Sequence, residues 1–318
     1  MYDYFMEKLV YQMFIIGTGE CLDESLKKGV GGVIFFTRDI QSVDQFKNLV
    51  SEIKSKSKEP LFLSIDQEGG KVERTENIHA RYLSPKYAYA KGDEFLRKQS
   101  EKIALELKNY GLNLNFAPCA DVNTNPKNPI IGERSFSANT DDVIEGVKIV
   151  SETFRENGII PCLKHYPGHG DADKDSHLTL PQIDLCLSKM EEIHIRPFKE
   201  AKEMIMAAHL HCTCFDKEII PASLSKNAIG YLRNVLNFDG VVITDDMVMK
   251  GVQQFGSLEA CVMAIEAGVD MFIFRDADRQ TISVIEDLVK RVEKDDSLKQ
   301  KVIKANERIK RLKKERLS

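Results

Sequence analysis

Short runs of apolar residues recur along the chain, and the segments between them repeat apolar residues every three or four positions. The runs are continuously apolar and rich in Val, Ile and Phe. Such runs are typical of strands that are covered on both faces, as in a parallel sheet. Eight strands are therefore predicted, within residues 13–17, 31–37, 60–66, 112–118, 158–166, 205–212, 240–246 and 270–275.

The segments between the runs carry start and stop signals for helices. Ser42 is placed to cap one helix, and Asp93 to cap another that ends at Gly111, where a left-handed residue is expected. The charged tail over 281–318 is predicted to be a long helix whose basic end forms a solvated face. Helical patterns before the tail cover 43–56, 94–111, 140–158, 223–238 and 257–268.

Strands that alternate with helices predict a (β/α)8 barrel. One composition runs through the whole chain without a low-complexity linker, so residues 1–318 are predicted to form a single barrel domain with a C-terminal helical extension. The alternative is an open, doubly wound sheet. It is disfavoured because no glycine-rich phosphate-binding sequence follows the first strand.

Composition limits the kinds of binding partner and the cellular compartment that are expected for this protein. A net charge of −4 gives no sign of a nucleic-acid surface. The N-terminus lacks the pattern of a signal peptide and no window reaches the ~18 apolar residues of a membrane span, so a cytoplasmic protein without membrane contacts is expected. Seven scattered cysteines favour free thiols in a reducing compartment.

Ionisable residues gather at the ends of the predicted strands. In (β/α)8 barrels the reactive residues lie at the C-terminal ends of the strands. Burying a charge without a partner is costly, so a ring of such residues predicts a polar pocket at this rim rather than a packed end. The strand-end residues are Asp66, Lys164, His165, His209, Asp245, Asp246 and Arg275.

The stretch KHYPGHGDADKDSHLTLP, residues 164–181, follows the fifth run and should lie over the same rim. Its alternating aspartates from Asp171 onward suggest a calcium loop. The spacing disagrees, because the sixth position is Ser176 instead of Gly and the twelfth is Gln182 instead of Glu.

A transition-metal site is a second interpretation. Pro167 and Gly168 interrupt the helix that would align the first two candidate histidines. His209 and His211, however, alternate along the sixth run and would face one side, which leaves a metal-dependent hydrolase open as an alternative. The candidate ligands are His165, His169, His177, His209 and His211.

A third interpretation pairs Asp175 with His177. A carboxylate that orients an imidazole raises its proton affinity, and such a pair can protonate a leaving group and later deprotonate water. Asp245, at the end of the seventh run, could then supply the nucleophile of a retaining glycosidase.

The block KHYPGHGDADKDSH resembles the signature of the bacterial β-N-acetylhexosaminidases of glycoside hydrolase family 3. Further blocks resemble that family in the same order along most of the chain: GVIFFTRDI, LSIDQEGGKVER, FAPCADVNTNP, IGERSFS, PASLSKNAIGYLRN, FDGVVITDDMVMKG and AIEAGVD.

The resemblance implies a role for each matching residue. Asp245 corresponds to the nucleophile and His177 to the acid/base, supported by Asp175. Many relatives in the wider family take a carboxylic acid/base from a second domain, for which this chain has no room, so the proton donor is expected from the loop. The implied sugar-binding residues are Asp66, Arg74, Arg134, Lys164 and His165, with His209 at the rim.

The resemblance also implies a substrate, a terminal β-linked N-acetylglucosamine on a peptidoglycan fragment. The bond would be cleaved with retention through a covalent glycosyl-aspartate, without a metal or cofactor. Because an imidazole replaces the second carboxylate, phosphate would be repelled less, and a phosphorylase is one alternative. The others are the metal-dependent hydrolase and a barrel that binds amino sugars without cleaving them.

Overall fold

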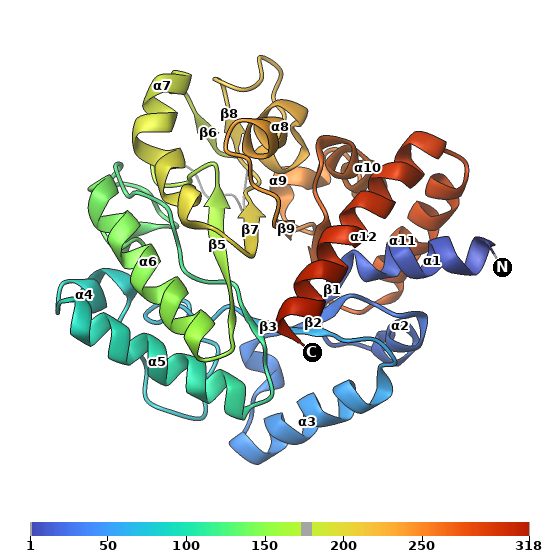
Figure 1. The fold of residues 1–318 in the computed structure, drawn as a ribbon, viewed down its shortest axis with the longest axis horizontal. Helices are drawn as coiled ribbons and strands as arrows, with labels where there is room; N and C mark the ends of the chain where they lie inside the picture. Colours follow the sequence, from blue (N-terminus) through green and yellow to red (C-terminus); the bar gives the residue numbers. More distant parts are fainter. Residues whose placement is uncertain (1, 173–179, 318) are drawn as a thin grey trace.

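The computed structural model describes residues 2–172 and 180–317 (Figure 1). Eight of the described strands close into a parallel barrel in the order β1-β10-β9-β7-β5-β4-β3-β2. Each overlaps one of the eight predicted runs, so the predicted barrel is confirmed. The strands are β1 (Phe14–Ile16), β2 (Gly32–Phe35), β3 (Phe62–Ile65), β4 (Leu114–Asn115), β5 (Ile160–Tyr166), β7 (Met204–Ala207), β9 (Val241–Asp246) and β10 (Met271–Phe274).

The sixth apolar run was predicted to form one strand, but it forms two. β7 ends at Ala207, and the end of the run forms a separate strand, β8 (His211–Cys212), which pairs with β6 (Gln182–Ile183) outside the barrel. The chain leaves the barrel here because the His211 amide donates to the Pro181 carbonyl, 2.8 Å away. An apolar run does not reveal such a change of partner, because both sheets bury it.

Most predicted helices and their ends are confirmed. The Ser42 side chain accepts a hydrogen bond from the Gln45 amide at the start of α3, and Gly111 has the expected left-handed φ of 88°. Asp93 is not the cap of α5, because Gly92 holds that position and Asp93 begins the helix. The first helices are α1 (Tyr2–Gln12), α2 (Leu22–Lys28), α3 (Val43–Lys56), α4 (Pro85–Tyr89), α5 (Asp93–Asn109) and α6 (Thr140–Glu156). The next are α7 (Leu187–Lys189), α8 (Lys226–Asn234), α9 (Lys250–Gln253) and α10 (Ser257–Ala267).

The tail forms two helices instead of one, α11 (Arg279–Glu293) and α12 (Asp296–Arg316). Asp295 starts the second, since its side chain accepts a hydrogen bond from the Leu298 amide. α12, red in Figure 1, crosses the end of the barrel where the strands begin.

The basic end of α12 is not simply a solvated face, as the sequence suggested. Lys313 is 5% exposed, and its ammonium donates to the Gln12 side chain and to the Gly31 carbonyl at the start of β2. Arg308 reaches Asp270 at the start of β10. Long basic side chains therefore close this end of the barrel, which charge periodicity alone cannot predict.

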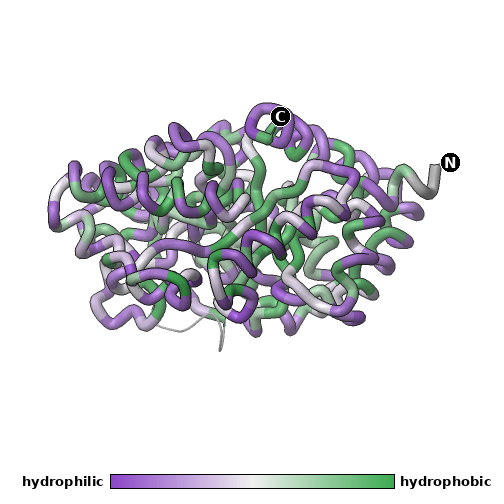
Figure 2. The backbone as a smooth tube through the Cα atoms, turned by 90° about the horizontal axis from the view of Figure 1, so that it is seen from below, coloured by the Kyte–Doolittle hydropathy of each residue, from purple (hydrophilic) through white to green (hydrophobic). Residues whose placement is uncertain are grey.

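The apolar residues of the strands and of the inner helix faces form one large core. Figure 2 shows hydrophilic residues along the outer helices and apolar segments passing through the middle of the molecule. Along residues 2–172 and 180–317, none of the helices combines the length and the apolar character that crossing a membrane requires.

Candidate active site

A small cavity of about 140 Å³ opens at the C-terminal ends of the barrel strands. Its wall includes Val72, Ile130 and Met206, which supply apolar surface among charged groups. Six of the predicted site residues, from four separate segments of the sequence, line this cavity; four of them were expected at strand ends, and Arg74 and Arg134 were expected from the family resemblance. They are Asp66, Arg74, Arg134, Lys164, His165 and Asp245.

A larger cavity of about 670 Å³ lies at the opposite end of the barrel, between the start of β9 and α12. None of the predicted site residues lines it. Two of its three arginines are paired, since Arg308 and Arg311 both contact the Asp239 carboxylate. The third, Arg316, donates to the Arg155 carbonyl. The smaller cavity is therefore the candidate active site, in agreement with where (β/α)8 barrels carry their chemistry.

Lys164 is held between two carboxylates. It extends from the end of β5 and is 2% exposed, and its ammonium lies 2.7 Å from Asp66 Oδ1 and 2.6 Å from Glu68 Oε1. Burial by itself would lower the pKa of Lys164, but the charges of Asp66 and Glu68 outweigh it and raise this pKa. The ammonium is therefore charged at neutral pH, although it is almost sealed from water.

Glu68 joins two of the predicted sugar-binding cations. Besides Lys164, it accepts two parallel hydrogen bonds of 2.9 Å from the Arg134 guanidinium. Burial would raise the pKa of Glu68, but Arg134 and Lys164 lower it further than burial raises it. The sequence analysis missed Glu68, although it lies two residues after Asp66 in the same block.

Arg74 lies at the outer side of this cluster. Its guanidinium is 3.9 Å from Asp66 Oδ2 and lies over the Phe36 ring, 5.8 Å from the ring centre. The buried Nε of Arg74 has no hydrogen-bond partner among the described residues. A donor held in this way beside a cavity can serve a polar ligand.

Asp245, the next-to-last residue of strand β9, lines the cavity. Burial would raise the pKa of Asp245, but the His165 and His209 side chains and the Asp246 amide lower it below its usual value. Asp246 is turned away, because it forms an ion pair with Arg275 and accepts a hydrogen bond from the Val248 amide. Of the two neighbouring aspartates, Asp245 is the ionised group that a substrate in the cavity would meet.

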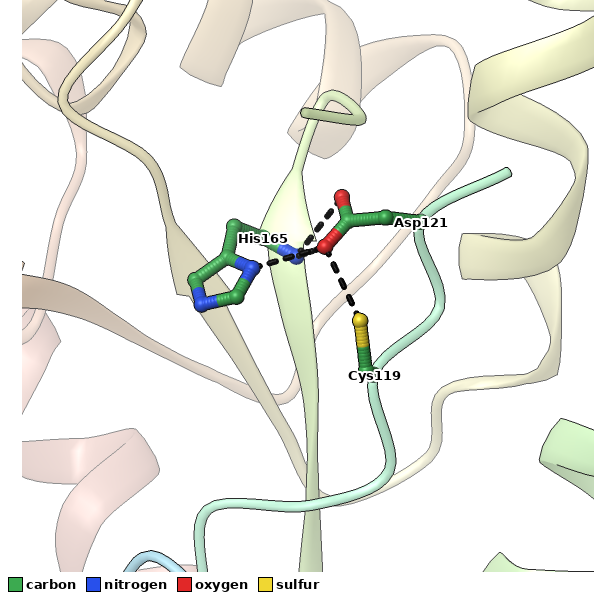
Figure 3. Close-up of side chains that lie close together, drawn as sticks. All are labelled: Cys119, Asp121 and His165. Carbon is green, nitrogen blue, oxygen red and sulfur yellow. Dashed lines mark hydrogen bonds and ion pairs between the residues drawn. The ribbon is translucent and has the colours of Figure 1, made fainter. Parts of the chain in front are cut away.

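His165 is held from behind by Asp121 (Figure 3). Its Nδ1 lies 2.7 Å from Asp121 Oδ2, and its Nε2 lies 3.3 Å from Arg134 Nη2. The Cys119 thiol donates to the same carboxylate at 3.1 Å. The sequence analysis missed Asp121 because it lies six residues beyond β4, and the predicted fourth run ends in proline.

Cys119, Asp121 and His165 are also near enough to one another to be considered as metal ligands. The hydrogen bonds of Asp121 and the protonated state of Cys119 argue against metal binding. Asp121 already accepts hydrogen bonds from His165, from the His169 amide and from the Cys119 thiol. Burial and the neighbouring Asp121 raise the pKa of Cys119 well above its usual value, which keeps it a thiol. The donor set therefore fits a hydrogen-bonded cluster better than a cation site.

The expected alternation of His209 and His211 on one strand is wrong. His209 follows β7, and its ring nitrogens meet the Ser223 hydroxyl at 2.8 Å and the Asp246 carbonyl at 3.1 Å. His211 lies in the other sheet, where its ring contacts the Ile220 carbonyl. His209 does not line the cavity but supports the backbone beside Asp245.

Asp175 and His177, the predicted proton-transfer pair, lie outside the described residues. The flanks of their segment are fixed on both sides. The His169 amide donates to Asp121 at 2.6 Å before the segment, and the Pro181 carbonyl accepts from the His211 amide after it.

The fold and the site together define a (β/α)8 barrel with an enclosed, charged cavity at the C-terminal ends of its strands, suited to a small polar ligand. Residues 6–312 match the glycosyl hydrolase family 3 N terminal domain, and the chain belongs to this family.

Similar proteins carry related names. The chain is 34% identical over 282 residues to the beta-hexosaminidase A of Pseudoalteromonas piscicida, covering 80% of this chain and 47% of that protein. It is 31% identical to the beta-hexosaminidase of Neisseria meningitidis serogroup C, covering 78% and 72%. A family 3 β-N-acetylglucosaminidase structure from Paenibacillus sp. str. FPU-7 superposes with a TM-score of 0.92 at 31% identity, covering 98% of this chain and 62% of that one. The chain thus spans about half the length of the first relative and under two thirds of the structure.

Proposed function

We propose that this barrel is a retaining β-N-acetylglucosaminidase that removes terminal β-linked N-acetylglucosamine. The observation that carries the proposal is the position of Asp245, an ionised carboxylate at a strand end that faces a cavity lined by Arg134, Lys164 and His165. The names of the similar proteins support the same activity.

The proposed reaction has two steps. An Asp245 oxygen attacks the anomeric carbon while the bond to the leaving oxygen breaks, and His177, oriented by Asp175, protonates that oxygen. Water then attacks the same carbon, releases Asp245 and gives its proton to His177, so the configuration is retained. The assignment of His177 and Asp175 rests on the sequence signature.

The sugar would be held by the charged groups of the cavity. Asp66 can accept from two hydroxyls, while Lys164, Arg74 and Arg134 can donate to sugar oxygens or to the acetamido carbonyl. Peptidoglycan fragments in the cytoplasm are the proposed source of the substrate, because the sequence resembles the bacterial β-N-acetylhexosaminidases.

The test is hydrolysis of an aryl β-N-acetylglucosaminide by the purified protein and by Asp245→Asn. We expect the substitution to lower kcat by about 10³-fold or more, since the nucleophile is lost. The neighbouring variant Asp246→Asn is the matched control and should retain far more activity. A slow-leaving substrate followed by mass spectrometry should place the covalent sugar on Asp245, and a label elsewhere would contradict the assignment.

The same assay separates the alternatives. Sugar 1-phosphate formed in phosphate buffer would identify a phosphorylase. Activity that is lost in a chelator and restored by zinc would identify a metal-dependent hydrolase. Binding of N-acetylglucosamine without turnover would identify a sugar-binding barrel.

A further inference from the structure

The Asp121 carboxylate is a fully buried charged group beside the candidate site. The residue is 0% exposed, and its carboxylate collects donors from the two sides of a tight turn. The main-chain amides of His165 and His169 reach it at 3.2 and 2.6 Å, and the His165 ring reaches it at 2.7 Å. Burial would raise the pKa of Asp121, but the His165 and His169 groups lower it further than burial raises it, so Asp121 is ionised.

These contacts fix where the proton of His165 lies. An ionised carboxylate only accepts hydrogen bonds, so His165 Nδ1 must carry the proton that points at Asp121. A guanidinium only donates, so a proton on His165 Nε2 would point at Arg134 Nη2, 3.3 Å away, and the ring nitrogen presents its lone pair there instead. This contact is long, and Nη2 already donates to Glu68 Oε1 at 2.9 Å, so a sugar hydroxyl can take the lone pair in its place. These two contacts favour the tautomer of His165 that carries its proton on Nδ1, and His165 lines the cavity.

We infer that Asp121 is a positioning residue that holds His165 in the Nδ1–H tautomer, so that Nε2 accepts a hydrogen bond from one sugar hydroxyl. The inference rests on the proposed function for the identity of the ligand. It also revises the expectation that His165 donates to the sugar. Lys164 and Arg134 supply hydrogen-bond donors in this cavity. His165 supplies an acceptor, Nε2, to which a sugar hydroxyl donates its hydrogen.

The surrounding backbone makes this tautomer hard to exchange. Asp121 accepts hydrogen bonds from the amides at both ends of the turn 165–169, which fixes the position of the His165 imidazole relative to the carboxylate. Within the turn, Gly168 has a φ of 122°, and a Cβ at this position would lie 2.6 Å from the His194 side chain. The ring cannot flip its nitrogens without losing the bond to Asp121.

The first test needs no substrate. Nitrogen-15 NMR of the histidine side chains reports which ring nitrogen carries the proton, and comparison with His165→Gln identifies the His165 signals. We expect a protonated Nδ1 and an unprotonated Nε2 in the wild-type protein at neutral pH. An Nε2–H tautomer or a doubly protonated ring would overturn the inference, whatever the protein hydrolyses.

Variants then test whether Asp121 causes this state. In Asp121→Asn the side-chain amide can donate to Nδ1, so we expect the Nε2–H tautomer. Asp121→Glu should restore the Nδ1–H signal at least in part, and Cys119→Ala, which removes the weak thiol donor to the same oxygen, should retain it. An unchanged tautomer in a folded Asp121→Asn protein would refute the positioning role. The wild-type spectrum remains decisive if that variant does not fold.

Kinetics test the consequence for the substrate. Replacing single sugar hydroxyls of the aryl glycoside by fluorine removes a donor but retains a weak acceptor. One analogue should lose about 10- to 100-fold in kcat/KM with the wild type, because Nε2 is then left with only the long contact to Arg134, and this penalty should shrink in Asp121→Asn. Equal penalties in both proteins, or none in either, would refute the acceptor role. A protein that cleaves no glycoside but shows the expected NMR signals would overturn only the proposed function.

Discussion

Glu68→Gln should destabilise the protein and weaken sugar binding together. The substitution retains the shape of the side chain but removes the charge that faces two buried cations. Lys164 retains Asp66 at 2.7 Å, whereas Arg134 keeps at most one of its two bonds of 2.9 Å, because Gln has one acceptor oxygen, and it loses the opposite charge altogether. Breaking a buried ion pair in this way costs about 3–5 kcal/mol, because a charge is left without compensation.

Urea unfolding followed by far-ultraviolet circular dichroism measures this cost, since the chain has no Trp for fluorescence. The matched control is Glu203→Gln, which breaks the same two-bonded contact with Arg155, at 2.6 and 3.2 Å, next to the start of β7. This variant should lower the free energy of unfolding but leave KM unchanged. If Glu68→Gln lost less than about 1 kcal/mol and retained its KM, the network would not hold Arg134 as described.

Two further predictions concern pH. Burial lowers the pKa of His169 to about 4, so between pH 6.5 and 4 the unfolded chain binds a proton that the folded chain does not. The free energy of unfolding should therefore fall by roughly 3 kcal/mol on acidification through this window, and the fall should be shallower in His169→Gln. Burial also lowers the pKa of Lys313 to about 7, so stability should rise from pH 7 toward 10.5. Unfolding curves of Lys313→Met that retain this rise would show that another group causes it.

The barrel could be predicted because its signal is local. Each buried parallel strand is a short, continuously apolar run, and the intervening helices carry their own caps, as Ser42 does for α3. Where prediction failed, the deciding contact was distant. The residues of 205–212 divide between two sheets because the His211 amide finds the Pro181 carbonyl, 30 positions earlier in the chain.

The same distinction applies to the site. Strand-end charges such as Asp66 and Asp245 can be predicted, because the barrel places every strand end at one rim. Glu68 and Asp121 could not, because each is defined by partners from distant segments of the chain. Glu68 contacts Arg134, 66 positions away, and Asp121 contacts His165, 44 positions away. No spacing rule in the sequence joins such pairs.

These missed carboxylates explain how the cavity can hold cations and an uncharged acceptor side by side. Glu68 holds Lys164 and Arg134 in their charged forms, so both are donors without needing water. Asp121 draws the proton of His165 away from the cavity, which leaves a lone pair between those donors. A sugar hydroxyl both donates and accepts, so a wall that alternates donors with an acceptor matches hydroxyls better than it matches a simple anion. Under the proposed function, the two carboxylates behind the wall would set its preference for a sugar, although Glu68 and Asp121 do not line the cavity themselves.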